Sequence, residues 1–321
     1  MTEVYTLDLN FQGIPHVIAS YLLKHAKGAV LIESGPGSTL EGLKAALKEH
    51  DLTVDDVTAV LLTHIHLDHA GAAGWLAQRG ARIYVHPNGA PHLLNPEKLL
   101  ASATRIYGPL MNQLWGEFLP VPEDQLTVLS DQQEINIEGL HLCALDTPGH
   151  ADHHFAYVFE DILFTGDVGA IRLPGLPQVR IPMPPPEFHL EKWRASVRKL
   201  QSIPAKRFAP THFGIHRDAA AHFAALRREL DAVEGFMQDL LPSDPPISVI
   251  SDRFMQWTEQ RARQQDIPRE TWPSYEAVSP SWMSATGMQR YWRKYRTSES
   301  SNQPEGTMLA SFSASFATGS K

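Results

Sequence analysis

Cysteine is almost absent from this chain of 321 residues, and two other features are missing altogether. The single Cys143 excludes an internal disulfide framework and a cysteine-rich zinc module. No stretch approaches the roughly 18 apolar residues of a membrane span, so the sequence predicts no membrane partner. The N-terminus, MTEVYTLDLNF, lacks a basic segment followed by an apolar run, which predicts no signal peptide. Because a chain with one thiol suits a reducing compartment, we expect a cytoplasmic protein.

Positive charge is also scarce. Lys and Arg total 28 against 36 Asp and Glu, which gives a net charge of −8, whereas nucleic-acid-binding proteins usually carry a basic excess. The one basic cluster, RYWRKYR (290–296), is predicted to belong to an amphipathic helix docked on the protein. We therefore expect a small-molecule substrate and no nucleic-acid partner. A homodimer is compatible with the sequence.

Alternating strands and helices are expected over most of the chain. Apolar runs predict strands at 30–33, 58–62 and 83–85, and further strands around 126–145 and over 155–164. Ser38 and Glu41 have the spacing of a capping box, which predicts that a helix begins at this serine. This alternation is typical of a fold that combines sheets with covering helices.

Changes in composition divide the chain into four parts. We predict a main domain over 1–240, interrupted by a helical insertion at about 87–122. A helical C-terminal extension is predicted over 241–298, and the Ser-rich stretch 299–321 is predicted to be disordered because it has few large aliphatic residues. The segment LPGLPQVRIPMPPP (173–186) is predicted to be a loop, since so much proline cannot sustain a helix or a central strand.

The segment THIHLDHAG places four candidate metal ligands within six positions, directly after an apolar run. His64 and His66 are two residues apart, so both side chains can face one side of an extended segment. Asp68 and His69 can then turn toward a neighbouring point, and one short loop could supply two ions. The simpler alternative, a polar turn after a strand, does not require so many ligating groups.

Three further candidate ligands follow predicted strands. His150 comes after a Pro-Gly turn in LDTPGH, Asp167 ends DILFTGD, and His212 lies in RFAPTHFG. Side chains just beyond the C-terminal ends of several strands can converge at one edge of a fold. Close behind the first of these, His153 and His154 either support a metal ligand by hydrogen bonds or merely bond backbone and solvent.

With these motifs in this order, roughly residues 1–235 resemble the metallo-β-lactamase fold superfamily. The resemblance implies an α/β (α+β) fold, a four-layer αββα sandwich with a two-metal site between its sheets. Since the true β-lactamases lack a bridging aspartate, the resemblance favours the glyoxalase II and lactonase branch. For the first ion the resemblance implies the ligands His64, His66 and His150. For the second ion it implies Asp68, His69 and His212. Asp167 would bridge the two ions.

The implied activity is that of a dinuclear metal-dependent hydrolase with two divalent ions. Zinc is the first candidate, and iron or manganese also suit histidine and carboxylate ligands. Because a bound metal lowers the pKa of water from 15.7 to about 7, a metal-bound hydroxide could attack a small ester, lactone or thioester. Asp68 has a second candidate role, as a catalytic proton donor or acceptor. The alternatives are a mononuclear iron oxygenase of the persulfide dioxygenase type and, less favoured by the acidic charge, a phosphoester hydrolase.

The insertion and the proline-rich loop are the candidate walls of a substrate pocket. In the insertion, Trp115 is suited to an apolar acyl or aromatic group, and Arg105 and Tyr107 could orient a carboxylate or a carbonyl. The alternative is that the apolar side chains of this segment only bury it on the sandwich.

Overall fold

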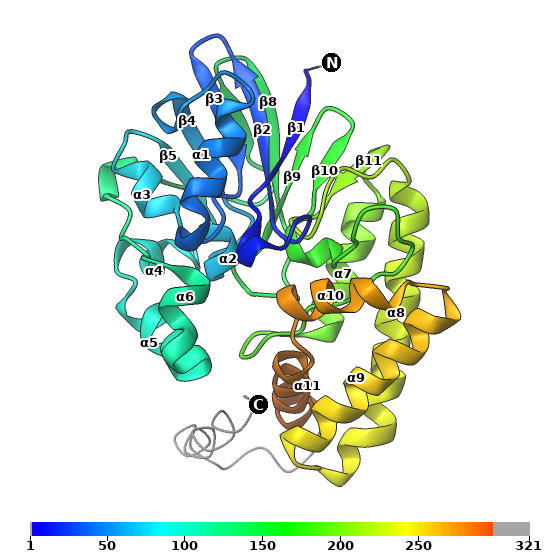
Figure 1. Cartoon of the computed structure of the whole chain (residues 1–321). Helices are drawn as coiled ribbons and strands as arrows, with labels where there is room; N and C mark the ends of the chain where they lie inside the picture. Colours follow the sequence, from blue (N-terminus) through cyan, green and yellow to red (C-terminus); the bar gives the residue numbers. More distant parts are fainter. Residues whose placement is uncertain (1, 298–321) are drawn as a thin grey trace.

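The computed structural model describes residues 2–297, so the tail predicted to be disordered, 299–321, lies outside the described residues. Two β-sheets lie face to face, and helices cover the outer face of each (Figure 1). This is the four-layer αββα sandwich that the sequence predicted. No helix in the described part of the chain is long and apolar enough to cross a membrane.

The first sheet has six strands in the order β1-β2-β3-β4-β5-β6. In the first three strands each neighbouring pair is antiparallel, whereas β3 to β6 are parallel and are connected through helices. Two of these strands, β1 and β2, lie where no strand was predicted. The bounds are β1 Val4–Asp8, β2 Ala19–His25, β3 Gly28–Ile32, β4 Val57–Leu61, β5 Arg82–Val85 and β6 Leu126–Val128.

The second sheet has five strands in the order β11-β10-β9-β8-β7. Neighbours are antiparallel except β10 and β11, which run parallel. The bounds are β7 Glu134–Ile137, β8 Leu140–Asp146, β9 Phe155–Phe159, β10 Ile162–Phe164 and β11 Arg207–Ala209.

Side chains along each strand point alternately to the two faces of the sheet, and both faces are buried. In β3, Val30 and Ile32 face the second sheet, and Leu31 between them faces the helices on the outer side. Between the sheets, Tyr21 of β2 meets Phe164 of β10 with ring centroids 5.3 Å apart. Continuous apolar runs are therefore stable in these strands, since both faces are withdrawn from water.

Within residues 2–297, six helices lie on the outer side of the first sheet or beyond its end. Three of them, α4 to α6, fall within the predicted helical insertion and project beyond the sheet (Figure 1). The bounds are α1 Leu40–Lys48, α2 Leu67–Ala70, α3 Ala73–Ala77, α4 Ala90–Leu94, α5 Glu97–Tyr107 and α6 Met111–Trp115.

The capping box predicted at Ser38 is wrong. This serine lies in a 3-10 turn, Gly37–Thr39, and α1 begins only at Leu40, without a side-chain cap. The Ser38 hydroxyl instead donates a hydrogen bond of 2.6 Å to the carbonyl oxygen of Leu114 in α6. A long-range contact with the insertion thus replaces the local cap.

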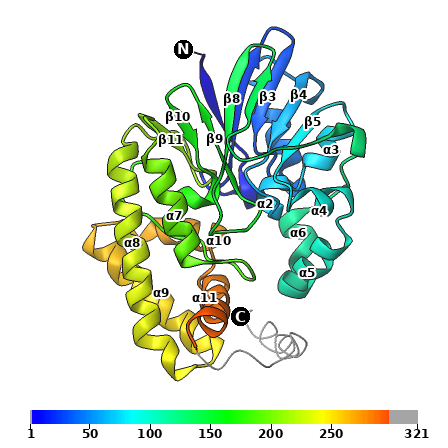
Figure 2. The same ribbon diagram turned by 180° about the vertical axis from the view of Figure 1, so that it is seen from behind.

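In the described chain, α7 and α8 lie beside the second sheet, and α9 to α11 form the C-terminal region beyond it (Figure 2). The amphipathic helix predicted around RYWRKYR is part of α11, which buries Met288 and Tyr291. Arg293 and Lys294 lie in the last turn of this helix, where positive charge is favourable. The bounds are α7 Leu190–Gln201, α8 Ala219–Leu240, α9 Ile247–Gln264, α10 Trp272–Val278 and α11 Ser281–Tyr295.

Candidate metal centre and active site

The loop after β4 changes from extended backbone to helix in the middle of the His-rich motif. His64 lies before the helix, His66 is its N-cap with φ −61° and ψ 154°, and Asp68 and His69 lie within α2. Because an extended segment and a helical turn point side chains in different directions, the first two residues reach one point and the next two reach another. This explains how six consecutive positions can contribute to two separate groups of candidate ligands.

His64, His66 and His150 form what we call the first cluster. The Nε2 atom of His64 and the Nε2 atom of His150 each lie 2.9 Å from Nδ1 of His66. The three side chains come from two loops, after β4 and after β8, and are buried or nearly so. Three imidazole nitrogens converging on one point are a ligand set for a divalent transition metal.

Asp68, His69 and His212 form the second cluster. Oδ2 of Asp68 lies 3.5 Å from Nε2 of His69 and 3.4 Å from Nε2 of His212. Two atoms bound to one zinc ion at tetrahedral angles are separated by about 3.4 Å. The spacing of the second cluster therefore fits such an ion.

Asp167 lies between the two clusters. Its Oδ1 atom is 3.3 Å from Nε2 of both His69 and His212, and its Oδ2 atom is 3.3 Å from Nε2 of His150. Among the described residues, the buried Asp167 Oδ1 and His69 Nε2 atoms have no hydrogen-bond partner. Buried polar atoms are rarely left unpaired, so these two atoms fit a metal ligand role better than a structural one.

A tight turn positions His150. Gly149 has φ +138°, and a Cβ atom there would lie 2.3 Å from Cα of Trp193 in α7. Only glycine allows this approach, which brings the loop after β8 against α7. The indole of Trp193 donates a hydrogen bond of 2.9 Å to the carbonyl oxygen of Val168, the residue next to Asp167.

Backbone carbonyls orient two of the ligand rings. Nδ1 of His150 lies 3.0 Å from the carbonyl oxygen of Pro182, and Nδ1 of His212 lies 2.7 Å from that of Val17. A proton on Nδ1 leaves Nε2 free to bind a metal, and it is Nε2 that points into each cluster.

Glu33 supports the second cluster and was not identified from the sequence. It is fully buried at the end of β3, with φ +70°, and its Oε1 atom lies 3.0 Å from Nδ1 of His69. The same carboxylate accepts hydrogen bonds from the hydroxyls of Thr63 and Thr211. The only available signal was an acidic residue directly after an apolar strand, a pattern that is common in loops.

The two neighbouring histidines differ in position. Nδ1 of His154 bonds the hydroxyl of Thr147 at 2.9 Å, and the backbone N–H of Val168 points to its Nε2 at 3.4 Å. His154 therefore fixes the loop that carries Asp167. His153 lines the cavity described below, and its Nε2 lies 3.3 Å from a carboxylate oxygen of Glu187.

The pKa values of the ligands differ between the clusters. Burial and the nearby His150 lower the pKa of His66 to about 3, so this ring is neutral at pH 7. At His212 burial also favours the neutral form, but the carboxylates of Asp167 and Asp68 outweigh it and raise the pKa to about 10. Burial opposes ionisation of Asp68 too, yet its histidine neighbours hold the pKa well below the usual range.

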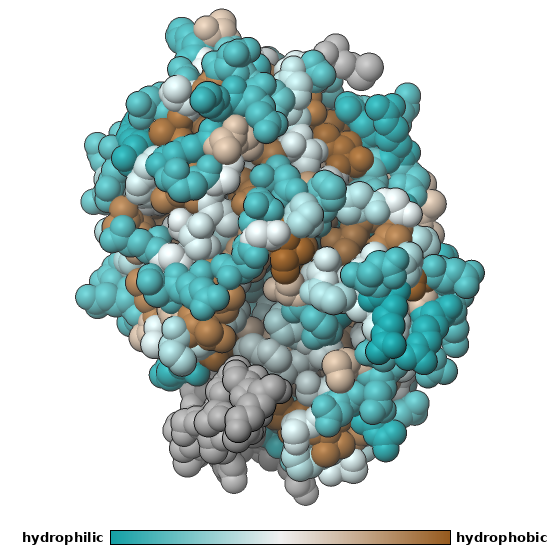
Figure 3. Space-filling model, in the orientation of Figure 1, coloured by the Kyte–Doolittle hydropathy of each residue, from teal (hydrophilic) through white to brown (hydrophobic). Residues whose placement is uncertain are grey.

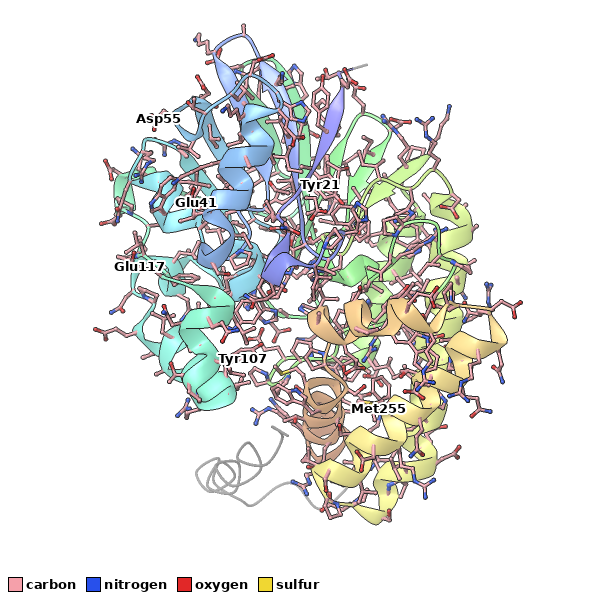
Figure 4. The ribbon with its side chains drawn as sticks, in the orientation of Figure 1. Tyr21, Glu41, Asp55, Tyr107, Glu117 and Met255 are labelled. Atoms are coloured by element: carbon pink, nitrogen blue, oxygen red, sulfur yellow. The ribbon has the colours of Figure 1, made fainter. Side chains whose placement is uncertain are left out.

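A cavity of about 440 Å³ opens above both clusters. His66, Asp68 and Asp167 form its floor, and α5, α6, the proline-rich loop and the start of α11 form its walls. Figure 3 shows a recess on this face, and Figure 4 shows Tyr107 beside it, on the side of α5 toward α10.

The structure brings two of the three predicted substrate residues to the cavity. Tyr107 and Trp115 line it and contact each other, with ring centroids 5.1 Å apart. Arg105 is exposed and is not among the cavity-lining residues, since it lies on another face of α5. Sequence reasoning also missed the contribution of residues 277–283 from the C-terminal region.

The sequence profile of the metallo-beta-lactamase superfamily matches residues 13–212. A metallo-beta-lactamase fold-containing protein of Sulfurisphaera tokodaii is 25% identical over 205 residues, which cover 63% of this chain and 74% of that one. An atrochrysone carboxyl ACP thioesterase of Aspergillus fumigatus is 31% identical over 197 residues, or 60% of this chain. The match spans only 50% of the length of that thioesterase.

Among solved structures, a metallo-beta-lactamase family protein from Thermus thermophilus has a TM-score of 0.65 and 22% sequence identity. The alignment covers 91% of this chain and 93% of that protein. The shared fold therefore extends beyond the region that the family profile matches and includes much of the helical C-terminal region.

Proposed function

Because the chain belongs to the metallo-beta-lactamase superfamily, we propose that it is a metal-dependent hydrolase that cleaves thioesters at a dinuclear centre. Esters and lactones are the related substrates. The observation that carries the proposal is the position of Asp167, with one carboxylate oxygen 3.3 Å from a ligand of the first cluster and the other 3.3 Å from two ligands of the second.

The residues of the two clusters fit two divalent ions, with zinc as the first candidate. Both clusters offer imidazole nitrogens, and the second adds a carboxylate oxygen, which suits zinc and also iron or manganese. When bound, such ions polarise the substrate carbonyl and lower the pKa of water so that hydroxide is available at neutral pH.

Asp68 is suited to accept a proton at the cavity floor. It is the most accessible ligand of the second cluster, with a side chain 17% exposed, and it lines the cavity. In the metal-free protein its histidine neighbours outweigh burial and lower its pKa, so its carboxylate is ionised at neutral pH and available to bind a metal. We propose that this residue both binds a metal and takes up the proton of the attacking water.

Tyr107 is suited to orient the substrate carbonyl. Burial, together with the nearby negative charge of Asp68, raises the pKa of its hydroxyl well above the usual value. The phenol therefore remains neutral and can donate a hydrogen bond. Arg105 lies outside the cavity lining and has no part in this proposal.

Two observations favour thioester hydrolysis over phosphoester hydrolysis and over the reaction of an iron oxygenase. The cavity walls are mainly apolar, which suits an acyl group better than a phosphate. The second cluster is complete, whereas an iron oxygenase with one ion would not need it. The similarity to a thioesterase supports the same reaction. A metal-bound hydroxide could attack the thioester directly, so the site would need no nucleophilic side chain.

The test is a hydrolysis assay on untagged protein with acetyl and longer acyl thioesters, the matching oxygen esters, and lactones. We expect thiol release that is lost after chelation and recovered when zinc or manganese is restored. Oxygen consumption with a persulfide, in the absence of any hydrolysis, would overturn the proposal in favour of the iron oxygenase.

A further inference from the structure

We propose that the cavity above the clusters binds a long apolar acyl group, and that the C-terminal region, residues 277–283, forms the wall that selects it. The inference rests on the hydrolase activity proposed above. It goes further because it assigns a substrate-binding function to a segment some 65 residues beyond the end of the family match at His212.

The size of the cavity exceeds what a small acyl group needs. A cavity of about 150 Å³ lined by aliphatic side chains accommodates benzene. The cavity here is about 440 Å³, roughly three times as large, so acetyl would leave most of it unfilled. An apolar chain that fills this space removes the apolar walls from water, which favours an occupant that reaches most of the lining.

The cavity lining combines a polar floor with mainly apolar walls, and these walls also include the polar side chains of Lys98, Ser102 and Glu187. The metal ligands His66 and Asp68 form the floor, where the ester carbonyl would lie. The walls above them are mainly aliphatic, aromatic and proline side chains. The apolar residues that these walls include are Leu99, Ile106, Leu110, Leu114, Met183 and Met283.

The walls come from segments far apart in the chain. On one side is α5 with Tyr107, and on the other is the junction of α10 and α11 with Trp282. The two rings are edge to face, with centroids 6.4 Å apart. Val278 at the end of α10 also packs against the apolar cluster of the first sheet and its helices. The junction therefore reaches across the cavity to the insertion.

Specific contacts hold this wall in place. The buried guanidinium of Arg180 donates hydrogen bonds to Oε1 of Glu276 at 2.5 Å and to the hydroxyl of Ser281 at 3.1 Å. A Cβ atom at Gly287 in α11 would lie 2.0 Å from the carbonyl oxygen of Met183, so only glycine allows α11 to pack directly on the proline-rich loop. A wall fixed in this way can discriminate between chain lengths.

The expected size of the effect follows from the burial of methylene groups. Each methylene that leaves water for an apolar site strengthens binding about fourfold. Affinity should therefore rise with chain length until the cavity is full, and it should level off or fall for longer chains. Removing a wall side chain should weaken the binding of long chains and leave short ones nearly unaffected.

The test is a binding series with S-alkyl thioethers of N-acetylcysteamine, which resemble thioesters but cannot be hydrolysed, measured by calorimetry on the metal-containing protein. We expect the dissociation constant to fall about fourfold for each methylene added up to the capacity of the cavity. Trp282→Ala should weaken binding of the longest ligands about tenfold or more and that of the S-methyl ligand less than twofold.

A matched pair of substitutions controls for folding. Met283 is buried against the cavity, whereas Met255 is 39% exposed on α9 and does not line it (Figure 4). Met283→Ala should reduce the chain-length dependence, and Met255→Ala should leave it unchanged. Equal effects of the two substitutions, or affinity independent of chain length, would overturn the inference. Failure to hydrolyse thioesters of every chain length would instead count against the proposed hydrolase alone, because the binding series requires no turnover.

Discussion

The first and second clusters share Asp167 but differ in protonation when no metal is bound. Burial and a neighbouring imidazole keep the pKa of His66 at about 3, so the first cluster offers neutral nitrogens. In the second cluster burial is outweighed by carboxylates, which raise the pKa of His212 to about 10. An ion entering the second cluster must therefore displace protons, whereas one entering the first need not. Neighbouring sites that share one loop can thus bind metal with different pH dependence.

The largest effect is expected at the residue that the two clusters share. Asp167→Asn removes the negative charge between them, and kcat/KM should fall about 10²–10³-fold or more. Circular dichroism should show an intact fold, and metal analysis should show loss of an ion. Asp55→Asn is the matched control, since Asp55 is exposed and lies far from the site (Figure 4). Full activity of the Asp167 variant with metal bound would disprove the two-metal mechanism.

The clusters can be separated by removing one ligand from each. His66→Ala should leave an ion only in the second cluster, and His69→Ala only in the first, so each variant should retain about one ion per chain. Metal content after dialysis, measured by mass spectrometry, distinguishes the cases. If either variant lost both ions, or kept both, the clusters would not be the separate sites described above.

Glu33 should affect the second ion selectively. The carboxylate contacts Nδ1 of His69 at 3.0 Å, and residues that support a ligand in this way typically contribute 10–100-fold, or about 1–3 kcal/mol, to metal affinity. Glu33→Gln should weaken binding of the second ion by about this factor and leave the first unchanged. Glu41→Gln, at an exposed position of α1, should change neither (Figure 4). A loss confined to the first ion would contradict the assignment.

The smallest effect is a difference in pH dependence. Because the pKa of His212 is raised to about 10, its ring is protonated at pH 7 in the metal-free protein and must lose that proton to bind an ion. Affinity at the second cluster, measured in His66→Ala, should therefore rise about tenfold or more per pH unit between pH 7 and 8. In His69→Ala, affinity at the first cluster should hardly change, since His66 is already neutral. If metal affinity changed equally with pH at both clusters, the proposed difference in protonation between them would be wrong.

The candidate ligands could be grouped from the sequence because each of them follows a strand. His150, Asp167 and His212 come just after β8, β10 and β11, and the sandwich brings these strand ends together. The sequence pattern therefore indicates where these side chains lie as well as which ligand types they offer. Glu33 also follows a strand, but its role depends on contacts with Thr63 and Thr211, which no local pattern contains.

Other features depend on long-range contacts and could not be predicted. The hydroxyl of Ser38 bonds Leu114, 76 positions away, and that contact replaces the predicted capping box. Residues 277–283 reach the cavity only because Arg180 and Glu276 fix the junction of α10 and α11. Arg105 and Tyr107 lie on one helix, and only the packing of that helix decides which of them faces the cavity.

The central claim is that one bridged centre holds two ions, and the most direct test is the metal content of the protein purified without chelator or metal-affinity tag. We expect about two zinc or manganese ions per chain, since the clusters together offer two ligand sets. One iron per chain, with no second ion bound on titration with zinc, would contradict the account.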